Sequence, residues 1–300
     1  MKKKTYLFAL MAMALTLGSC SDNENGIGGE TSKYITVSTS IGNMTRVATD
    51  AKGGQTFEEG DEISVYAWTG DATVAPETRE RVVNNAINKL TNGSWISNPQ
   101  MLWKNNRDKH YFIGVYPTAA ISDLTAGEYT FDVNKQTESD LLVAVNKDGL
   151  SYNVDEQQPV PLTFTHVMAK LVVNLTYKNQ WGGIPTVEKV VVGNAAKEAT
   201  INYLTKVVTP STTAKEDFSL PEITENTKYV SVIIPQEEVK QLTIVIGGKN
   251  FVYDNGTPFK LESGKITTVN LEVGRDEIKL GDVKITDWED GSTFSGEAIN

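Results

Sequence analysis

Residues 162–177 read Leu-Thr-Phe-Thr-His-Val-Met-Ala-Lys-Leu-Val-Val-Asn-Leu-Thr-Tyr, a long run of strand-forming residues. Leu, Phe and Val recur at every second position over much of this run, the period of a strand with one face on a core. β-branched and aromatic residues, which favour strands, are frequent in it. We therefore expect a strand over 162–177.

The same alternation recurs on both sides of this run. Further strands are expected at 35–41, 63–68, 110–116, 141–145, 187–192, 229–234, 242–246, 266–273 and 278–288. Turn-forming pairs separate many of them: Asn92-Gly93, Asp148-Gly149, Gly182-Gly183, Gly247-Gly248 and Asn255-Gly256. The pattern predicts an all-β sandwich fold rather than alternating strands and helices.

One stretch, 82–90, fits two periods. Val83, Ile87 and Leu90 could form one face of a helix, but steps of two residues fit as well. The stretch is rich in Asn and lacks a strong N-cap residue, so we favour a strand.

A domain boundary is expected within 151–161, just before the opening stretch. The segment contains Asp155, Glu156, Gln157 and Gln158 in succession, followed by two prolines, Pro159 and Pro161. Proline cannot donate to a strand ladder, so this segment is predicted to be a linker or crossover. We expect an N-terminal β-sandwich domain over 33–155 and a C-terminal one over 156–300.

The first 19 residues have the form of a secretory signal. Three lysines at 2–4 precede an eleven-residue apolar run, Leu7 to Leu17, which is well short of the ~20 residues that span a bilayer. Leu17-Gly18-Ser19-Cys20 has the form of a bacterial lipobox, in which the signal is cut before a lipid-modified cysteine. We predict a signal peptide over 1–19 and lipidation, including a palmitate-type acyl chain, at Cys20.

Cys20 is the single cysteine of the chain, which does not suit a disulfide. The alternative is an ordinary cleaved signal followed by an unmodified cysteine. Residues 20–32 are polar and glycine-rich, and we expect a flexible tether between the lipid and the folded domains. These features predict a surface-exposed protein anchored in the cell outer membrane.

Charge and composition restrict the partners. Removal of residues 1–19, which contain three lysines and no acidic residue, changes the formal net charge from −10 to −13. An acidic surface disfavours nucleic acid and electrostatic docking on anionic lipid. Hydrophobic residues make up 39% of the chain, which is too high for general disorder.

Several ordered segments together resemble the fimbrillin-like family, the lipoprotein pilins of Gram-negative anaerobes that include the major and minor fimbrial subunits. They are Thr45-Arg46, Phe57 to Tyr66, Trp103, Tyr111 to Pro117, Ser139 to Ala144, Leu162 to Leu175, Ile234 to Gln236 and Ile285 to Trp288. The resemblance implies two transthyretin-like β-sandwich domains in tandem and a role as a structural or adhesive subunit of the fimbrium, or pilus. It also implies that other fimbrial subunits are partners by donor-strand complementation.

In many members of that family an arginine-specific protease removes an N-terminal segment. A strand from another subunit then fills the groove that this segment leaves. Arg46 follows the expected strand at 34–41 and is the candidate processing site; the alternative is an ordinary loop arginine. Twelve residues interrupted by glycine follow Trp288, a shorter tail than the donor strand expected of a shaft pilin.

Residue patterns for catalysis are scarce, so we predict no enzyme, no cofactor and no metal site. His110 and His166 lie in expected strands outside any metal-ligand motif. The acidic group at 58–62 is expected to be a solvated turn. The segment from Asp132 resembles a calcium loop, but Thr137 stands where that loop requires Gly.

A second hypothesis is a monomeric surface lipoprotein that binds glycans or host ligands. Five tryptophans could supply stacking platforms for sugars, although tryptophans in strands are more often buried. Trp181, beside Gly182-Gly183, is the one most expected to be exposed. Polymerisation would distinguish the two hypotheses.

Overall fold

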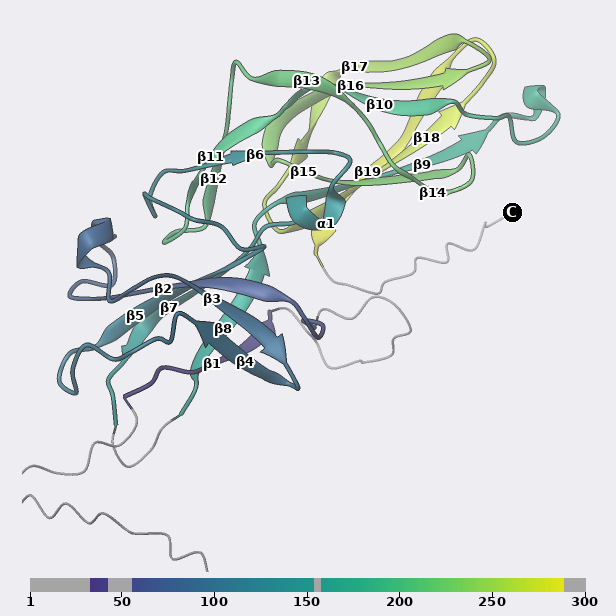
Figure 1. The fold of residues 1–300 in the computed structure, drawn as a ribbon. Coiled ribbons are helices and arrows are strands. Elements are labelled where there is room, and N and C mark those ends of the chain that lie inside the picture. The colour runs from purple at the N-terminus through teal and green to yellow at the C-terminus, as the bar shows by residue number, and fades with distance from the viewer. Residues whose placement is uncertain (1–32, 43–55, 154–157, 289–300) are drawn as a thin grey trace, which may run out of the picture. The chain divides into compact units, whose positions relative to one another are not determined.

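Strands dominate the computed structural model, which describes residues 33–42, 56–153 and 158–288 (Figure 1). Helical structure in these residues is confined to the four-residue α1 (Gln136–Ser139) and two 3-10 turns, η1 (Thr78–Glu80) and η2 (Asn179–Trp181). The prediction of an all-β sandwich fold is confirmed.

The first sheet has seven strands in the order β1-β8-β7-β5-β2-β3-β4. Their bounds are β1 (Val37–Ile41), β2 (Glu62–Thr69), β3 (Val83–Thr91), β4 (Ser94–Asn98), β5 (His110–Tyr116), β7 (Leu142–Leu150) and β8 (Val160–His166). Alternate side chains from six of these strands, including Val65, Phe112 and Phe164, form one buried cluster. The two ends of this sheet are β1 and β4.

The remaining strands form three sheets. A five-stranded sheet contains β14 (Glu222–Thr224), β15 (Lys228–Ile233), β9 (Ala169–Tyr177), β18 (Lys265–Val273) and β19 (Ile278–Asp287), in that order. A four-stranded sheet contains β13 (Lys215–Ser219), β10 (Lys189–Ala196), β16 (Gln236–Ile246) and β17 (Lys249–Leu261). A three-stranded sheet contains β12 (Val207–Pro210), β11 (Glu198–Asn202) and β6 (Gly127–Thr130).

The opening stretch forms two strands rather than one. β8 belongs to the seven-stranded sheet and β9 to the five-stranded sheet. Between them, Val167 N–H donates to the Leu141 carbonyl at 3.0 Å, while the Met168 carbonyl accepts from Gly264 N–H at 2.9 Å. Successive residues thus bond to different sheets, and no continuous ladder can form through 167–168.

The change of sheet at 167–168 does not coincide with the domain boundary expected at 155/156. β8 lies after that point but pairs with β7 and β1, so the change of sheet occurs at 167–168. β6 from the first half pairs with β11 from the second, and both halves contribute to the larger buried cluster. The division into two domains, together with its boundary, stays a prediction.

The ambiguous stretch at 82–90 is a strand, as favoured. It forms most of β3, and Asn92 and Gly93 then adopt positive φ angles of 50° and 74°. These angles suit the tight turn expected of an Asn-Gly pair. The turn leads into β4, which sequence analysis did not predict.

Candidate assembly site at strand β1

Strand β1 lies at one end of the seven-stranded sheet and has one neighbouring strand. It runs parallel to β8, with Val37 opposite Val160 and Ile41 opposite Phe164. Val37 is buried, while Ser38 and Ser40 are exposed, as the alternating sequence predicts. The strand is five residues long, so few backbone bonds hold it.

The backbone before β1 is also paired. Ile35 N–H donates to the Met101 carbonyl at 2.9 Å, and Trp103 N–H donates to the Lys33 carbonyl at 3.0 Å. Tyr34 and Leu102 form a bridge between these two bonds. The expected strand at 34–41 is therefore confirmed as an extended segment.

No strand among the described residues pairs with the other edge of β1. The Thr36 carbonyl accepts from Val160 N–H at 2.8 Å, and Gly42 N–H donates to the Phe164 carbonyl at 2.7 Å. Even-numbered residues thus direct their backbone groups toward β8. Because these directions alternate along a strand, the N–H and C=O groups of Val37, Thr39 and Ile41 point away from β8. Such an edge can accept another strand.

A groove of about 530 Å³ runs along β1 and is lined on its far side by residues of β3, β4 and the turn between them. Its lining comprises Val37 to Ile41, Thr56, Phe57, Leu90 and Gly93 to Trp95. The Trp95 indole N–H donates to Thr39 Oγ1 at 3.0 Å and joins β4 to β1. The two terminal strands of the sheet therefore face the same groove, and one hydrogen bond crosses it.

Aromatic side chains close one side of this groove. The Phe57 ring packs edge-on against Trp95, Tyr116 and Phe164, with centroid distances of 5.3, 5.4 and 5.1 Å. A Cβ at Gly114 would lie 2.6 Å from the Phe164 ring, so only glycine fits beside it. These contacts fix the Phe164 ring of β8 beside β1.

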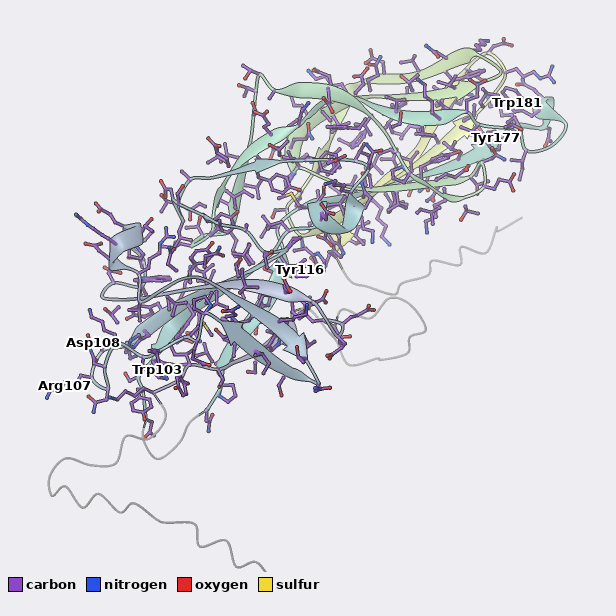
Figure 2. All side chains as sticks on the ribbon, in the orientation of Figure 1. Trp103, Arg107, Asp108, Tyr116, Tyr177 and Trp181 are labelled. Carbon is purple, nitrogen blue, oxygen red and sulfur yellow. The ribbon has the colours of Figure 1, made fainter. Side chains whose placement is uncertain are left out.

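Tyr116, labelled in Figure 2, gives this cluster a titratable group. Its hydroxyl donates to Asp61 Oδ1 at 3.3 Å. Burial, together with the negative charge of Asp61, raises the pKa of Tyr116 to about 12. Tyr116 is consequently neutral at physiological pH.

The two site residues predicted from sequence, Cys20 and Arg46, lie outside the described residues. Lipidation and cleavage therefore stay predictions. Neither Trp95 nor Phe57 was identified from sequence as part of this site. The Asn92-Gly93 turn was a usable signal, because a hairpin after β3 would place the next strand at the edge of the sheet.

Both histidines have structural partners. His110 is fully buried; its Nε2 accepts from Lys104 N–H at 3.1 Å, and its Nδ1 lies 3.1 Å from the Asp108 carbonyl. Burial lowers the pKa of His110. His166 Nδ1 lies 2.8 Å from Asp140 Oδ1, and the His166 ring stacks on Trp288 at 4.1 Å.

The acidic segments act as turns in the described structure. Asp61 Oδ2 accepts from Glu58 N–H at 2.7 Å, and Glu59 Oε1 accepts from Asn92 N–H at 2.9 Å. Asp132 Oδ1 accepts from Asn134 N–H at 2.9 Å. Within the described ranges, no group of three or more His, Cys, Asp or Glu side chains could hold a metal ion.

The expectation that Trp181 is exposed is wrong. Its side chain is half-buried against Phe251, at a centroid distance of 5.8 Å, and its N–H donates to the Val273 carbonyl at 2.9 Å (Figure 2). The loop glycines beside it do not prevent η2 from folding back onto β18. Trp181 therefore offers no open stacking platform.

None of the helices in the described part of the chain is long and apolar enough to cross a membrane.

Comparison with known proteins identifies relatives over most of the chain. The profile of the fimbrillin-like family matches residues 45–288. A proposed fimbrium subunit, Fim1C of Bacteroides uniformis, is 25% identical over 316 residues, covering 97% of each chain.

Two crystal structures of proposed cell adhesion proteins share the fold. The one from Bacteroides ovatus has a TM-score of 0.63 and 18% identity, covering 86% of this chain and 98% of its own. The one from Bacteroides uniformis has a TM-score of 0.63 and 19% identity, covering 85% and 98%.

Proposed function

Because this chain belongs to the fimbrillin-like family, we propose that it is a structural and adhesive fimbrial subunit, exported as an outer-membrane lipoprotein and assembled by strand exchange at β1. The lipid on Cys20 delivers the subunit, and cleavage after Arg46 frees the segment that contains β1. The role is structural, and we assign no catalytic step.

The single-sided pairing of β1 carries this proposal. Loss of β1 would expose the backbone edge of β8 and the apolar side chains of Val160, Leu162 and Phe164, which are now buried. An extended segment of a second copy would satisfy those backbone groups and cover those side chains. The intact chain is protected from such pairing because its own β1 occupies the site.

Limited digestion with an arginine-specific protease tests this assembly. We expect the cleaved chain to form ladders on native gels and the Arg46→Gln variant to stay monomeric. Arg107→Gln is a matched control, since Arg107 is an exposed loop arginine that does not line the β1 groove, and it should polymerise like the wild type. A cleaved wild-type chain that remains monomeric at high concentration would favour the monomeric, ligand-binding lipoprotein.

The lipid anchor is tested separately. Cys20→Ala should move the protein from the membrane fraction to the soluble fraction, because it removes the acyl chains that hold it. Unchanged membrane partitioning of this variant would contradict the lipoprotein assignment and leave the strand-exchange result unaffected.

A further inference from the structure

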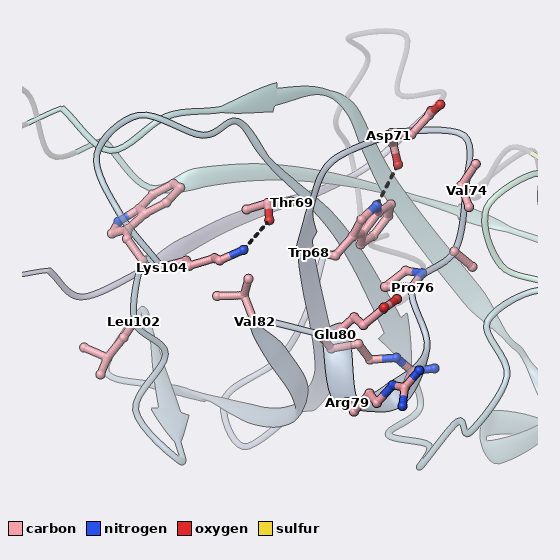
Figure 3. Close-up of a pocket in the computed structure, with 13 residues that line it drawn as sticks. Trp68, Thr69, Asp71, Val74, Pro76, Arg79, Glu80, Val82, Leu102 and Lys104 are labelled. Carbon is pink, nitrogen blue, oxygen red and sulfur yellow. Dashed lines mark hydrogen bonds between the residues drawn. The ribbon is translucent and has the colours of Figure 1, made fainter.

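A second concavity, distinct from the β1 groove, lies where β2 ends (Figure 3). Its volume of about 840 Å³ is within the range of small-molecule sites. Loop 71–76, η1, the residues leading into β3 and the segment 102–104 form its walls. Apolar side chains and charged side chains of both signs line it.

Four main-chain N–H groups of the walls are already hydrogen-bonded. Val82 N–H donates to the Ala67 carbonyl at 2.8 Å, and Val74 N–H to the Asp71 carbonyl at 3.4 Å. Trp103 and Lys104 donate their N–H groups to the Lys33 carbonyl and to His110 Nε2. These four groups are not free to pair with an added strand, which favours recognition by side chains.

The cations in the pocket differ in their partners. The Arg79 guanidinium pairs with Glu77 at 2.9 Å, and Arg81 donates to the carbonyls of Ile121 and Ser122, each at 2.6 Å. Lys104 Nζ donates to the neutral Thr69 Oγ1 at 3.1 Å and makes no ion pair with a described carboxylate. Thr69 thus holds an ammonium group in the pocket with donors to spare.

The rest of the lining suits a hydroxyl-rich ligand with an apolar face. Val74 and Leu102 are 59% and 50% exposed, and Val82 lies between Lys104 and Glu80 in Figure 3. Asp71 Oδ1 accepts hydrogen bonds from the N–H and the hydroxyl of Thr73. No described residue donates a hydrogen bond to Asp71 Oδ2. Carboxylate oxygens accept from hydroxyl groups, and the apolar side chains can cover C–H surface.

We infer that this pocket binds an acidic saccharide, whose carboxylate pairs with Lys104 and whose hydroxyls bond to Asp71 and Glu80. The apolar face of the sugar ring lies on Leu102 and Val82. The net charge of −10 repels an anion at long range. Binding of the saccharide carboxylate therefore depends on its attraction to the nearby Lys104 ammonium group. The inference deepens the adhesive part of the proposed function and does not depend on strand exchange.

Titration calorimetry with 3′-sialyllactose tests the pocket, with lactose as the neutral control. We expect saturable binding of the sialylated sugar at millimolar concentration or below, weaker binding of lactose, and a loss of affinity as salt is raised. Lys104→Gln should weaken binding about tenfold, the effect of losing one charge-assisted hydrogen bond. Lys89→Gln, which alters an exposed lysine paired with Glu62 elsewhere, should not change it.

Three results would overturn the inference: no saturable binding of 3′-sialyllactose, equal affinity for lactose, or unchanged affinity in Lys104→Gln. Thermal unfolding of each variant verifies that the chain is folded. All measurements use the uncleaved, monomeric chain, so a failure to polymerise after cleavage would leave this result standing.

Discussion

Strands β1 and β18 are both parallel partners of the two strands in the opening stretch, and they differ in what holds them. β1 pairs with β8 over five positions and has no strand on its other side among the described residues. β18 pairs with β9 over eight positions and with β19 on its other edge. A similar alternating sequence thus forms a strand paired on one edge at one place and a strand paired on both edges at the other.

A buried charge in each strand tests this difference most strongly. Val269→Asp in β18 should abolish cooperative folding, because an unpaired carboxylate in the core costs several kcal/mol. Val37→Asp should instead release β1 and leave the remaining sheets folded. Thermal unfolding and hydrogen exchange distinguish the two outcomes. Equal loss of structure in both variants would show that β1 is as integral as β18.

Truncation of a buried residue in the strand beside β1 or β18 should have the next largest effect. Phe164→Ala in β8, opposite Ile41 of β1, and Leu175→Ala in β9, opposite Leu271 of β18, should lower the free energy of unfolding by about 3–5 and 2–5 kcal/mol. In Phe164→Ala, the free energy of opening that hydrogen exchange measures for the β1 amides should fall by more than the free energy of unfolding. The reason is that β1 is expected to detach while the rest of the sheet stays folded. If β18 detached in Leu175→Ala in the same way, the comparison would fail.

A smaller change sharpens the comparison at a single hydrogen bond. Thr39→Val removes the acceptor for Trp95 and should cost about 1 kcal/mol, seen as faster hydrogen exchange in β1. Thr176→Val is the matched control, because Thr176 Oγ1 donates to the Leu271 carbonyl of β18 at 3.3 Å. Exchange in β18 should hardly change. An unaltered β1 in Thr39→Val would show that the indole bond does not retain the strand.

Alkaline pH should produce the smallest effect. The folded-state pKa of Tyr116 is about 12 against an ordinary value of 10.0, so the folded chain binds the phenolic proton more tightly than the unfolded chain. Its contribution is fully present below pH 10 and is lost as pH rises toward 12. Tyr116→Phe should reduce the decline measured by denaturant unfolding. Other tyrosines also have raised pKa values, so part of the decline should remain in Tyr116→Phe. A decline as steep as that of the wild type would exclude Tyr116 as a contributor.

Period-two alternation was sufficient to predict β1 and the all-β class, because each depends on neighbouring residues. The strand β3 needed a second signal, the Asn-rich composition without a strong N-cap residue. Alternation could not show that 162–177 divides between two sheets, since the division depends on bonds to Leu141 and Gly264. The change of sheet comes at 167–168, after β8, and the composition of 151–161 gave no sign of it. Proline at 161 did not exclude a strand, because β8 accommodates it.

The assembly site was predictable only in part. The strand before Arg46 was visible in the sequence, but its single-sided pairing depends on β8, about 120 residues away. Trp95 and Phe57 belong to the groove only because the sheet brings β4 and β1 to a common opening. Trp181 was expected to be exposed because its loop is glycine-rich, yet its contact with Phe251 is also distant in sequence.

Sedimentation of a chain that begins at Val47 tests the central claim, the displaceable β1, most directly. We expect concentration-dependent polymers that disappear when a peptide of residues 33–42 is added, because the peptide restores the β1 pairing with β8. A chain that stays monomeric without the peptide, or polymers that the peptide leaves unchanged, would contradict strand exchange at this site.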